Sequence, residues 1–121
     1  MRVIHTDALD FADLPGRRSA DPLAPDGGAP VSVRLVHVEP GPRTMHRHPH
    51  SVEVIYVLEG RGVHRQGDDE RPVRAGDLVL VDTGVAHCTT AEPGEPLRLL
   101  CFFPHPDLAQ NMEETTCSTS S

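Results

Sequence analysis

The stretch between residues 31 and 103 consists of short β-type segments that alternate with turns of Gly, Pro and Asp. The segments are rich in Val, Ile and Leu. They span residues 31–38, 52–58, 62–66, 71–74, 77–81, 86–90 and 97–103. No segment of ten or more residues has the 3.6-residue apolar periodicity of an amphipathic helix. Short strands at near-regular spacing are typical of an antiparallel sandwich or barrel, so the sequence predicts an all-β fold.

The N-terminal part, residues 1–30, is rich in Asp, Pro and Gly. It predicts a loop-rich arm in which Val3 and Ile4 could form a short edge strand. Residues 22–30 predict a loop, because Pro and Gly interrupt both helices and strands.

Residues 31–104 form the predicted barrel domain, and residues 105–121 form a C-terminal tail. The last part of the tail, 111–121, is mostly Glu, Thr and Ser with one Cys. Because it has almost no apolar side chains to bury, we expect it to be largely disordered. Its Ser, Thr and Cys residues could be a modification substrate, but a solvated tail is the simpler interpretation.

Composition excludes several classes of partner. The 121-residue chain carries a net charge of −7, with one Tyr, three Phe and no Trp, which argues against nucleic-acid binding. No apolar run approaches the roughly 18 residues of a membrane helix, and the N-terminus lacks the apolar core of a signal peptide. Cys88, Cys101 and Cys117 are an odd number without a C-x-x-C spacing, which predicts reduced thiols and a cytoplasmic location.

Three of the eight histidines and one glutamate lie within the eight residues 46–53. His46 and His48 point to the same side of an extended backbone, since side chains two apart share a face. Glu53 opens the next predicted strand on the same side as Ile55 and Val57, and it can approach the two imidazoles if that side faces the interior. His87 begins another strand after a turn. Three imidazoles and one carboxylate suit a divalent transition metal.

The other histidines have a plainer interpretation. A single His on a strand is more often a core or surface residue than a ligand, and this applies to the four at positions 5, 37, 64 and 105. A pair two residues apart on a polar turn can also arise by chance. His50 lies too close to Glu53 to join the proposed set, and it could be a neighbour of the site, part of a pocket wall or without a role.

The spacing of these residues resembles the cupin superfamily, in particular its small single-domain bacterial members. The first cupin motif is G-x5-H-x-H-x3,4-E-x6-G, and this chain matches it from His46 through Glu53 to Gly60. Gly41 is one residue closer to the first histidine than the motif requires.

The second cupin motif is G-x5-P-x-G-x2-H-x3-N, and it matches from Gly76 through Gly84 to His87. Asp82 stands where the motif has Pro, and Ala91 where it has Asn. Neither change removes a metal ligand, but the altered turn could shift where His87 enters the site.

The resemblance implies an antiparallel jelly-roll barrel that holds one divalent transition metal (Fe(II), Mn, Ni, Co, Cu or Zn). The implied metal ligands are His46, His48, Glu53 and His87. It also implies a small organic substrate inside the barrel, with a dioxygenase, isomerase or polyketide-cyclase type of reaction. The alternative is a non-catalytic cupin that binds a metal or a small molecule. No DNA-binding helix pair accompanies the barrel, which excludes the usual cupin transcription regulator.

The resemblance leaves the catalytic residues unassigned. Tyr56, His64 and Arg34 could donate protons or anchor a substrate, although a structural or exposed role is the simpler interpretation for each. Arg17 and Arg18 could reach an acidic substrate from the N-terminal arm, and a solvated pair is the default.

The predicted strand at residues 52–58 is apolar on both faces. A strand with one wet face would alternate, so its outer face predicts a cover. We expect a homodimer, although two sheets folding on each other would explain part of the pattern.

Overall fold

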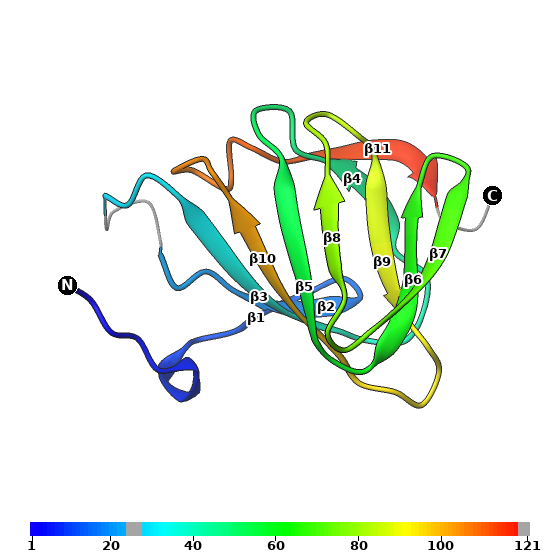
Figure 1. Ribbon diagram of the computed structural model, residues 1–121, viewed down its shortest axis with the longest axis horizontal. Coiled ribbons are helices and arrows are strands. Elements are labelled where there is room, and N and C mark those ends of the chain that lie inside the picture. The colour runs from blue at the N-terminus through cyan, green and yellow to red at the C-terminus, as the bar shows by residue number, and fades with distance from the viewer. Residues whose placement is uncertain (24–27, 119–121) are drawn as a thin grey trace.

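The computed structural model describes residues 1–23 and 28–118, which form two antiparallel sheets (Figure 1). One sheet has the strand order β1-β2-β3-β10-β5-β8. Its strands are Ala12–Leu14, Arg17–Ala20, Ser32–Val38, Leu97–Phe103, Glu53–Glu59 and Leu78–Val81, in that order. The other has the order β11-β4-β9-β6-β7. Its strands are Glu113–Ser118, Thr44–Arg47, His87–Ala91, Arg61–Gln66 and Asp69–Arg74. A short 3-10 turn, η1, spans Thr6–Ala8.

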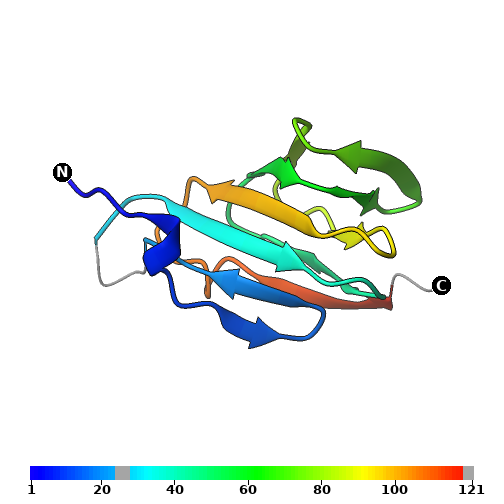
Figure 2. The same ribbon diagram turned by 90° about the horizontal axis from the view of Figure 1, so that it is seen from below.

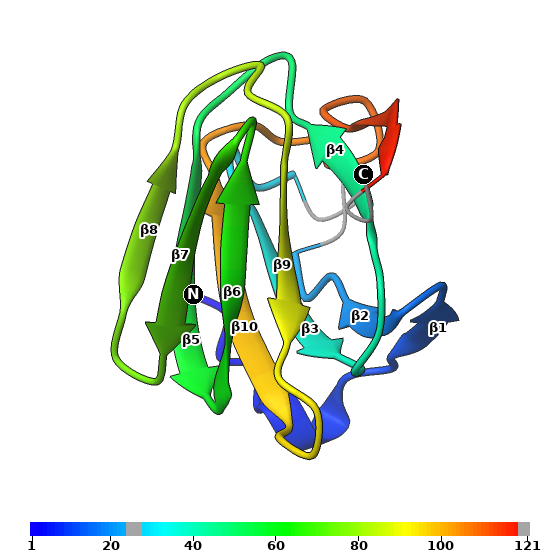
Figure 3. The same cartoon turned by 90° about the vertical axis from the view of Figure 1, so that its right-hand side faces the viewer.

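The fold class predicted from the sequence is confirmed. Each of the seven predicted segments coincides with a strand, from β3 at residues 32–38 to β10 at residues 97–103. Figure 3 shows β4, β9, β6 and β7 side by side in one sheet. This is the two-sheet arrangement of a jelly-roll barrel.

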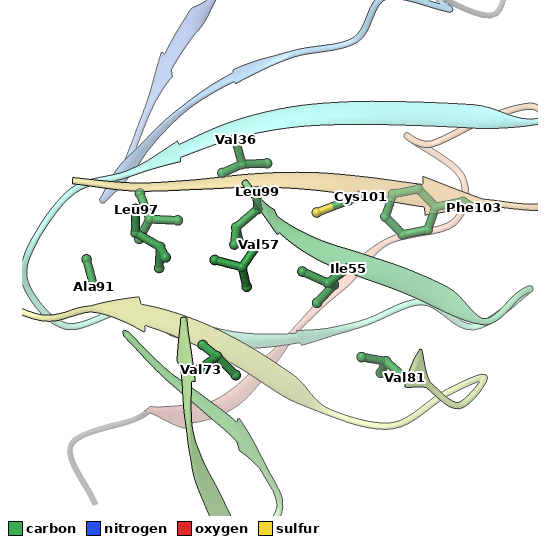
Figure 4. Close-up of a cluster of buried hydrophobic side chains, with 11 residues drawn as sticks. Val36, Ile55, Val57, Val73, Val81, Ala91, Leu97, Leu99, Cys101 and Phe103 are labelled. Carbon is green, nitrogen blue, oxygen red and sulfur yellow. The ribbon is translucent and has the colours of Figure 1, made fainter. Parts of the chain in front are cut away.

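The hydrophobic core lies between the sheets, and strand alternation fills it. Every second residue of β10 is buried, beginning with Leu97 and ending with Phe103, whereas the residues between them are more exposed. Leu99 pairs with Val36 of β3 on one side and with Val57 of β5 on the other, so the buried rows run across three strands. Figure 4 shows these side chains facing Val73 and Ala91 of the other sheet, and Val81 at the end of β8 belongs to the same core cluster. Removal of this apolar surface from water is the main stabilising contribution to such a fold.

Gly60 makes the connection between β5 and β6 possible. Its φ is +90°, and a Cβ atom there would lie 1.6 Å from the carbonyl oxygen of Pro96. Only glycine combines this backbone conformation with so close an approach. Gly60, which ends the first motif, is therefore required at the connection between β5 and β6.

The prediction of an edge strand at Val3 and Ile4 is wrong. Both side chains are exposed outside any strand, and the edge of the sheet is instead formed by β1 and β2. Figure 2 shows these two strands extending the sheet beyond β3. β2 pairs with β3 along its whole length and buries Ser19 and Ala20, whereas Val3 and Ile4 stand before the first turn. Residues 24–27 of the predicted loop lie outside the described residues.

The expectation of a largely disordered tail is wrong for residues 113–118, which form β11 and pair with β4. β11 is a polar strand that pairs with β4 through its backbone. It therefore forms although it has almost no apolar side chains to bury. Asn111, just before this strand, is fully buried. The last three residues, 119–121, lie outside the described residues.

Among the described residues, no helix has the length and apolar character needed to span a membrane.

Candidate metal centre

Segments from both sheets meet at the site. β4 carries His46 and is followed by His48, while β9 begins at His87, which lies directly opposite His46 in the ladder. Glu53 begins β5 in the other sheet and faces the same interior. The amide of Gly84 donates to the carbonyl of His48 at 2.8 Å. This bond ties the turn before β9 to the loop that carries the other imidazoles, and His87 enters the cluster despite Asp82 in that turn.

The four side chains that the sequence singled out lie together. Nε2 of His87 is 2.7 Å from Oε1 of Glu53, and Nε2 of His48 is 3.1 Å from the same oxygen. The ring of His46 is centred 4.4 Å from that of His87 and 5.1 Å from that of His48. All four residues are buried, with at most 8% of their surface exposed.

Backbone carbonyls fix which nitrogen of each ring carries a proton. Nδ1 of His48 lies 2.7 Å from the carbonyl oxygen of Asn111, and Nδ1 of His87 lies 2.8 Å from that of Val85. A carbonyl only accepts, so each Nδ1 must donate. In a neutral ring the other nitrogen, Nε2, is then a bare acceptor, and both Nε2 atoms face the carboxylate of Glu53. Facing acceptors in a buried site repel one another, and a cation between them, either a proton or a metal ion, would relieve this repulsion.

The buried polar atoms agree with this interpretation. Nε2 of His48 has no hydrogen-bond partner among the described residues, although it lies close to Glu53. The distance is short, but the geometry is not that of a hydrogen bond. A metal ion would satisfy this atom.

Electrostatics keep two of the four residues, His46 and Glu53, in the protonation states that metals prefer. Burial lowers the pKa of His46 to about 2, and the proximity of His87 contributes in the same direction, so His46 stays neutral. Burial alone would raise the pKa of Glu53, but the approach of His48 and His87 outweighs it and holds that pKa well below its usual range. Neutral imidazoles and a charged carboxylate are the metal-binding forms.

The donor set fits a divalent transition metal. One ligand atom from each of the four residues lies within 4.8 Å of all the others. Bonds of about 2.0–2.2 Å place two ligand atoms at most about 4.4 Å apart, so only small adjustments are needed. Imidazole and carboxylate donors suit Fe(II), Mn, Co, Ni, Cu and Zn, and the four residues do not select among them.

Asn111 holds the ligand-bearing loop from the C-terminal side, and sequence reasoning missed it. Its carbonyl accepts from Nδ1 of His48, its side-chain oxygen accepts from the backbone N–H of His50, and its side-chain amide donates to Ser51 Oγ, each within 2.8 Å. The fully buried Asn111 thus orients a candidate ligand. Nothing in the surrounding polar sequence distinguishes this residue.

His64 is a buried core residue, as the plainer interpretation has it, and it lies near the cluster. Its ring is centred 5.8 Å from that of His87 and is 7% exposed. Nε2 lies 2.9 Å from the side-chain oxygen of Gln66 and donates to it, so Nδ1 accepts from the hydroxyl of Thr89 at 3.0 Å. Burial lowers the pKa of His64, more than the contact with Gln66 raises it. A neutral, hydrogen-bonded imidazole therefore stands beside the candidate ligands.

The remaining histidines lie outside the cluster. His50 is exposed, and its ring stacks on that of His105 with centroids 5.6 Å apart. His37 stacks on Phe11 on the outer face of the sheet, and His5 is exposed near η1.

The two cysteines whose side chains are described are unpaired and buried. Cys101 faces the interior beside Glu53, and burial raises the pKa of its thiol well above the usual range, with the Glu53 charge adding to the effect. Burial likewise raises the pKa of Cys88. Neither thiol is poised to become a thiolate ligand.

Two hollows are lined in part by residues of the cluster, and a third is lined in part by His64. The smallest, about 10 Å³, lies in the interior, and it is lined in part by Arg34, Arg43, His46, Glu53, His87 and Cys101. A second, about 110 Å³, is lined in part by Arg17, Arg43, His46, Met112 and Glu114. The third, about 390 Å³, opens between β7 and β8 and is lined in part by His64, Gln66, Val73, Leu78 and Val79.

Comparisons with known proteins agree with this geometry. The family model described as "Cupin domain" matches residues 34–103, which is more than half of the chain. A curated but uncharacterized protein of Methanocaldococcus jannaschii is 31% identical over 75 residues, which is 61% of this chain and 60% of that protein. The match thus spans less than two thirds of that relative.

Solved structures share the fold over nearly the whole chain. Ectoine synthase from P. lautus superposes with a TM-score of 0.79 at 22% identity, covering 97% of this chain and 91% of that one. The polyketide cyclase RemF from Streptomyces resistomycificus superposes with a TM-score of 0.78 at 22% identity, covering 98% and 88%. At this identity the likeness concerns the fold.

Proposed function

Because this chain belongs to the cupin family, we propose that it binds one divalent transition metal and acts on a small organic molecule held beside that metal. The proposed ligands are His46, His48, Glu53 and His87. The proposed reaction is of the dioxygenase, isomerase or polyketide-cyclase type. The enzymes with similar folds, ectoine synthase and a polyketide cyclase, support a catalytic role.

The convergence of two bare Nε2 atoms on one carboxylate oxygen carries this proposal. His48 and His87 each donate Nδ1–H to a backbone carbonyl, so neither neutral ring can donate to Glu53. A buried arrangement of three acceptors is unfavourable unless a cation joins them. The chain's own geometry thus supports metal binding independently of the family.

The surrounding residues would orient the reaction and exclude water. Bound metal would polarise an oxygen of the substrate. The apolar side chains of Ile55 and Leu99 line the interior beside the ligands and keep it dry. His64 is our candidate for accepting a proton, because its Nε2 proton is held by Gln66 and its Nδ1 would accept through the Thr89 hydroxyl that donates to it.

Metal analysis of two histidine variants tests the ligand assignment. His87→Ala should lower the metal content of purified protein strongly, since Nε2 of His87 faces the centre. His50→Ala is the matched control, because that ring is exposed and stacks on His105. Equal loss of metal in both variants would show that the wrong imidazoles have been chosen.

The alternative function is a binding protein without turnover, and the small interior volume favours it. The hollow enclosed by the ligands is about 10 Å³, which is room for about one water. Oxygen uptake by the metal-loaded protein with catechols, flavonols and 1,3-dicarbonyls separates the two functions. The binding function is favoured if the metal-loaded protein takes up no oxygen with any of these compounds.

We further propose that the chain forms a homodimer through the outer face of β5, β8 and β10. Two apolar rows cross these strands, Phe102–Val54–Leu80 and Leu100–Tyr56–Leu78. Leu78 and Leu80 are 64% and 58% exposed, and Tyr56 and Phe102 are also exposed. An exposed apolar surface of this kind is typical of a protein–protein contact. The cytoplasmic location predicted from the cysteine pattern stays a prediction.

A further inference from the structure

Arg34 is a buried cation beside the candidate metal centre. It lies on the inward face of β3 and is 5% exposed. Its Nη1 contacts only the thioether of Met112, at 3.9 Å, and its guanidinium lies 5.7 Å from the centroid of the Phe103 ring. Its Nε has no hydrogen-bond partner among the described residues. A sulfur atom and a ring face compensate a buried charge poorly, so Arg34 lacks an anion.

No described carboxylate supplies that anion. Glu53 is a buried acid whose pKa the charge of Arg34 helps to lower, but its Oε1 faces His48 and His87, and no ion pair joins it to Arg34 among the described residues. Asp21 and Glu114 lie at the rim, are exposed, and form no ion pair with Arg34 in the described part of the chain.

Two further arginines reach the same region. Arg17 of β2 pairs with Val38, so it faces inward like the alternate residues of β3, whereas Arg18 faces outward beside Asp13 and Phe11. Arg43 precedes β4 and is held by a 2.8 Å bond from Nη1 to the carbonyl oxygen of Thr89.

These three guanidinium groups are close enough to repel one another. Burial lowers the pKa of Arg43 to about 10, and the charges of Arg17 and Arg34 contribute in the same direction. Burial and Arg34 also lower the pKa of Arg17, whereas the carboxylate of Glu114, at the rim of the same hollow, opposes this change. An anion between these groups would relieve both the burial cost and the repulsion.

A hollow for such an anion adjoins a candidate ligand. Arg17, Arg43 and His46 line a hollow of about 110 Å³. Arg43 and His46 also line the small interior hollow, together with Arg34. The space is therefore suited to a molecule of a few atoms that reaches the face of His46.

We infer that Arg34 and Arg17, with Arg43 beside them, form an anion subsite that binds a carboxylate group of the substrate next to the metal centre. This inference rests on the proposed function, because it assigns the substrate class of the same site. The substrate is accordingly a small organic acid. Guanidinium groups bind carboxylates through paired, charge-assisted hydrogen bonds.

Titration calorimetry with malonate tests the subsite, and malonamide, the neutral diamide of the same shape, is the matched ligand control. Wild-type protein, Arg34→Gln, Arg17→Gln and Arg18→Gln are each loaded with Zn²⁺, and their metal content is measured before titration at constant ionic strength. We expect wild type and Arg18→Gln to bind malonate equally and malonamide undetectably. Arg34→Gln and Arg17→Gln should bind malonate at least about tenfold more weakly with unchanged metal content.

Equal malonate affinity in all four proteins, or equal affinity for malonate and malonamide, would overturn the subsite while leaving the metal centre intact. If wild type takes up no metal, the proposed function fails. The same titration on metal-free protein then still decides whether the arginines bind the anion.

Arg17→Gln keeps the test decisive if Arg34→Gln does not fold, because Arg17 is only half-buried at the edge of the sheet. Thermal unfolding gives a second measurement. Malonate should raise the melting temperature of wild type and of Arg18→Gln, but not that of Arg17→Gln. A rise of the same size in all three would contradict the inference.

Discussion

Nε2 of His87 lies 2.7 Å from Oε1 of Glu53 in the interior, although the two residues stand 34 positions apart in the chain. His87 begins a strand of one sheet and Glu53 begins a strand of the other. The contact therefore joins the two sheets at the candidate metal centre, and its chemistry determines several properties of the protein.

Glu53→Gln should abolish metal binding without destabilising the metal-free protein. The amide of glutamine can donate to the Nε2 atoms of His48 and His87, which the carboxylate cannot. We expect metal affinity to fall by more than about 100-fold and the melting temperature of the metal-free protein to stay or rise. Metal analysis and thermal unfolding in a chelator measure the two effects. A loss of several kcal/mol in the metal-free protein would instead indicate protonated imidazoles paired with Glu53.

Asn111→Ala should weaken metal binding from outside the ligand set. The substitution removes the bonds that hold His50 and Ser51 in place around His48. Loss of a group that orients a ligand typically costs about 10–100-fold in metal affinity. Competition with a chromogenic chelator measures it, and Gln110→Ala, an exposed neighbour, is the control. Similar affinity in both variants would show that the loop is held by other contacts.

Acid should destabilise the metal-free protein. Burial lowers the pKa of His46 from 6.5 to about 2, so between these values the unfolded chain binds a proton that the folded chain does not. Stability is thus complete above about pH 6.5 and is lost as the pH falls. The loss should reach about 2–3 kcal/mol near pH 4.5. Urea unfolding at several pH values in a chelator measures it, with His5→Gln as an exposed control. If His46→Asn showed the same dependence of the free energy of unfolding on pH, His46 would not be the group responsible.

Gly60→Ala should destabilise the fold far more than Gly76→Ala. Both glycines have similar φ values, +90° and +96°, but a Cβ atom at Gly60 would collide with Pro96, whereas none lies within 4 Å at Gly76. We expect about 1–2 kcal/mol for Gly76→Ala from backbone conformation alone. Gly60→Ala should cost more than about 3 kcal/mol or prevent folding. Urea unfolding compares the two, and equal costs would mean that the β5–β6 connection relaxes freely.

Negative charge introduced on the outer face of β8 should dissociate the proposed homodimer. Leu78→Glu combined with Leu80→Glu places two carboxylates in the exposed apolar rows, where burial against a second copy would be costly. We expect a monomer by light scattering after gel filtration, with wild-type circular dichroism. Leu14→Glu, an exposed leucine on β1, should leave the dimer intact. A monomeric wild type would exclude the homodimer.

Local sequence predicted most of the barrel because strand alternation and turn residues act over a few positions. Val54, Ile55, Tyr56 and Val57 alternate between surface and core as their pattern indicates, and the glycines of the two motifs end their strands. The same spacing singled out the four residues that meet at the site. Asp82 in place of Pro did not displace His87, because the backbone bond from Gly84 to His48 fixes that turn.

Other features depend on contacts between distant segments, which no local pattern encodes. Asn111 sits in a polar stretch, and only the pairing of β11 with β4 brings it to His48. Arg17 points inward because it lies opposite Val38 in the ladder with β3. The neighbouring Arg18 carries the same charge but points outward.

The sequence by itself therefore determined the strands, the turns and the candidate ligands, since these follow from side-chain period and spacing. Only the tertiary structure decided which imidazole nitrogens are bare, which arginines are buried and what holds the ligand loop. These properties arise from burial and from the way that hydrogen bonds and strand register join separate segments, as between Asn111 and His48 at a separation of 63.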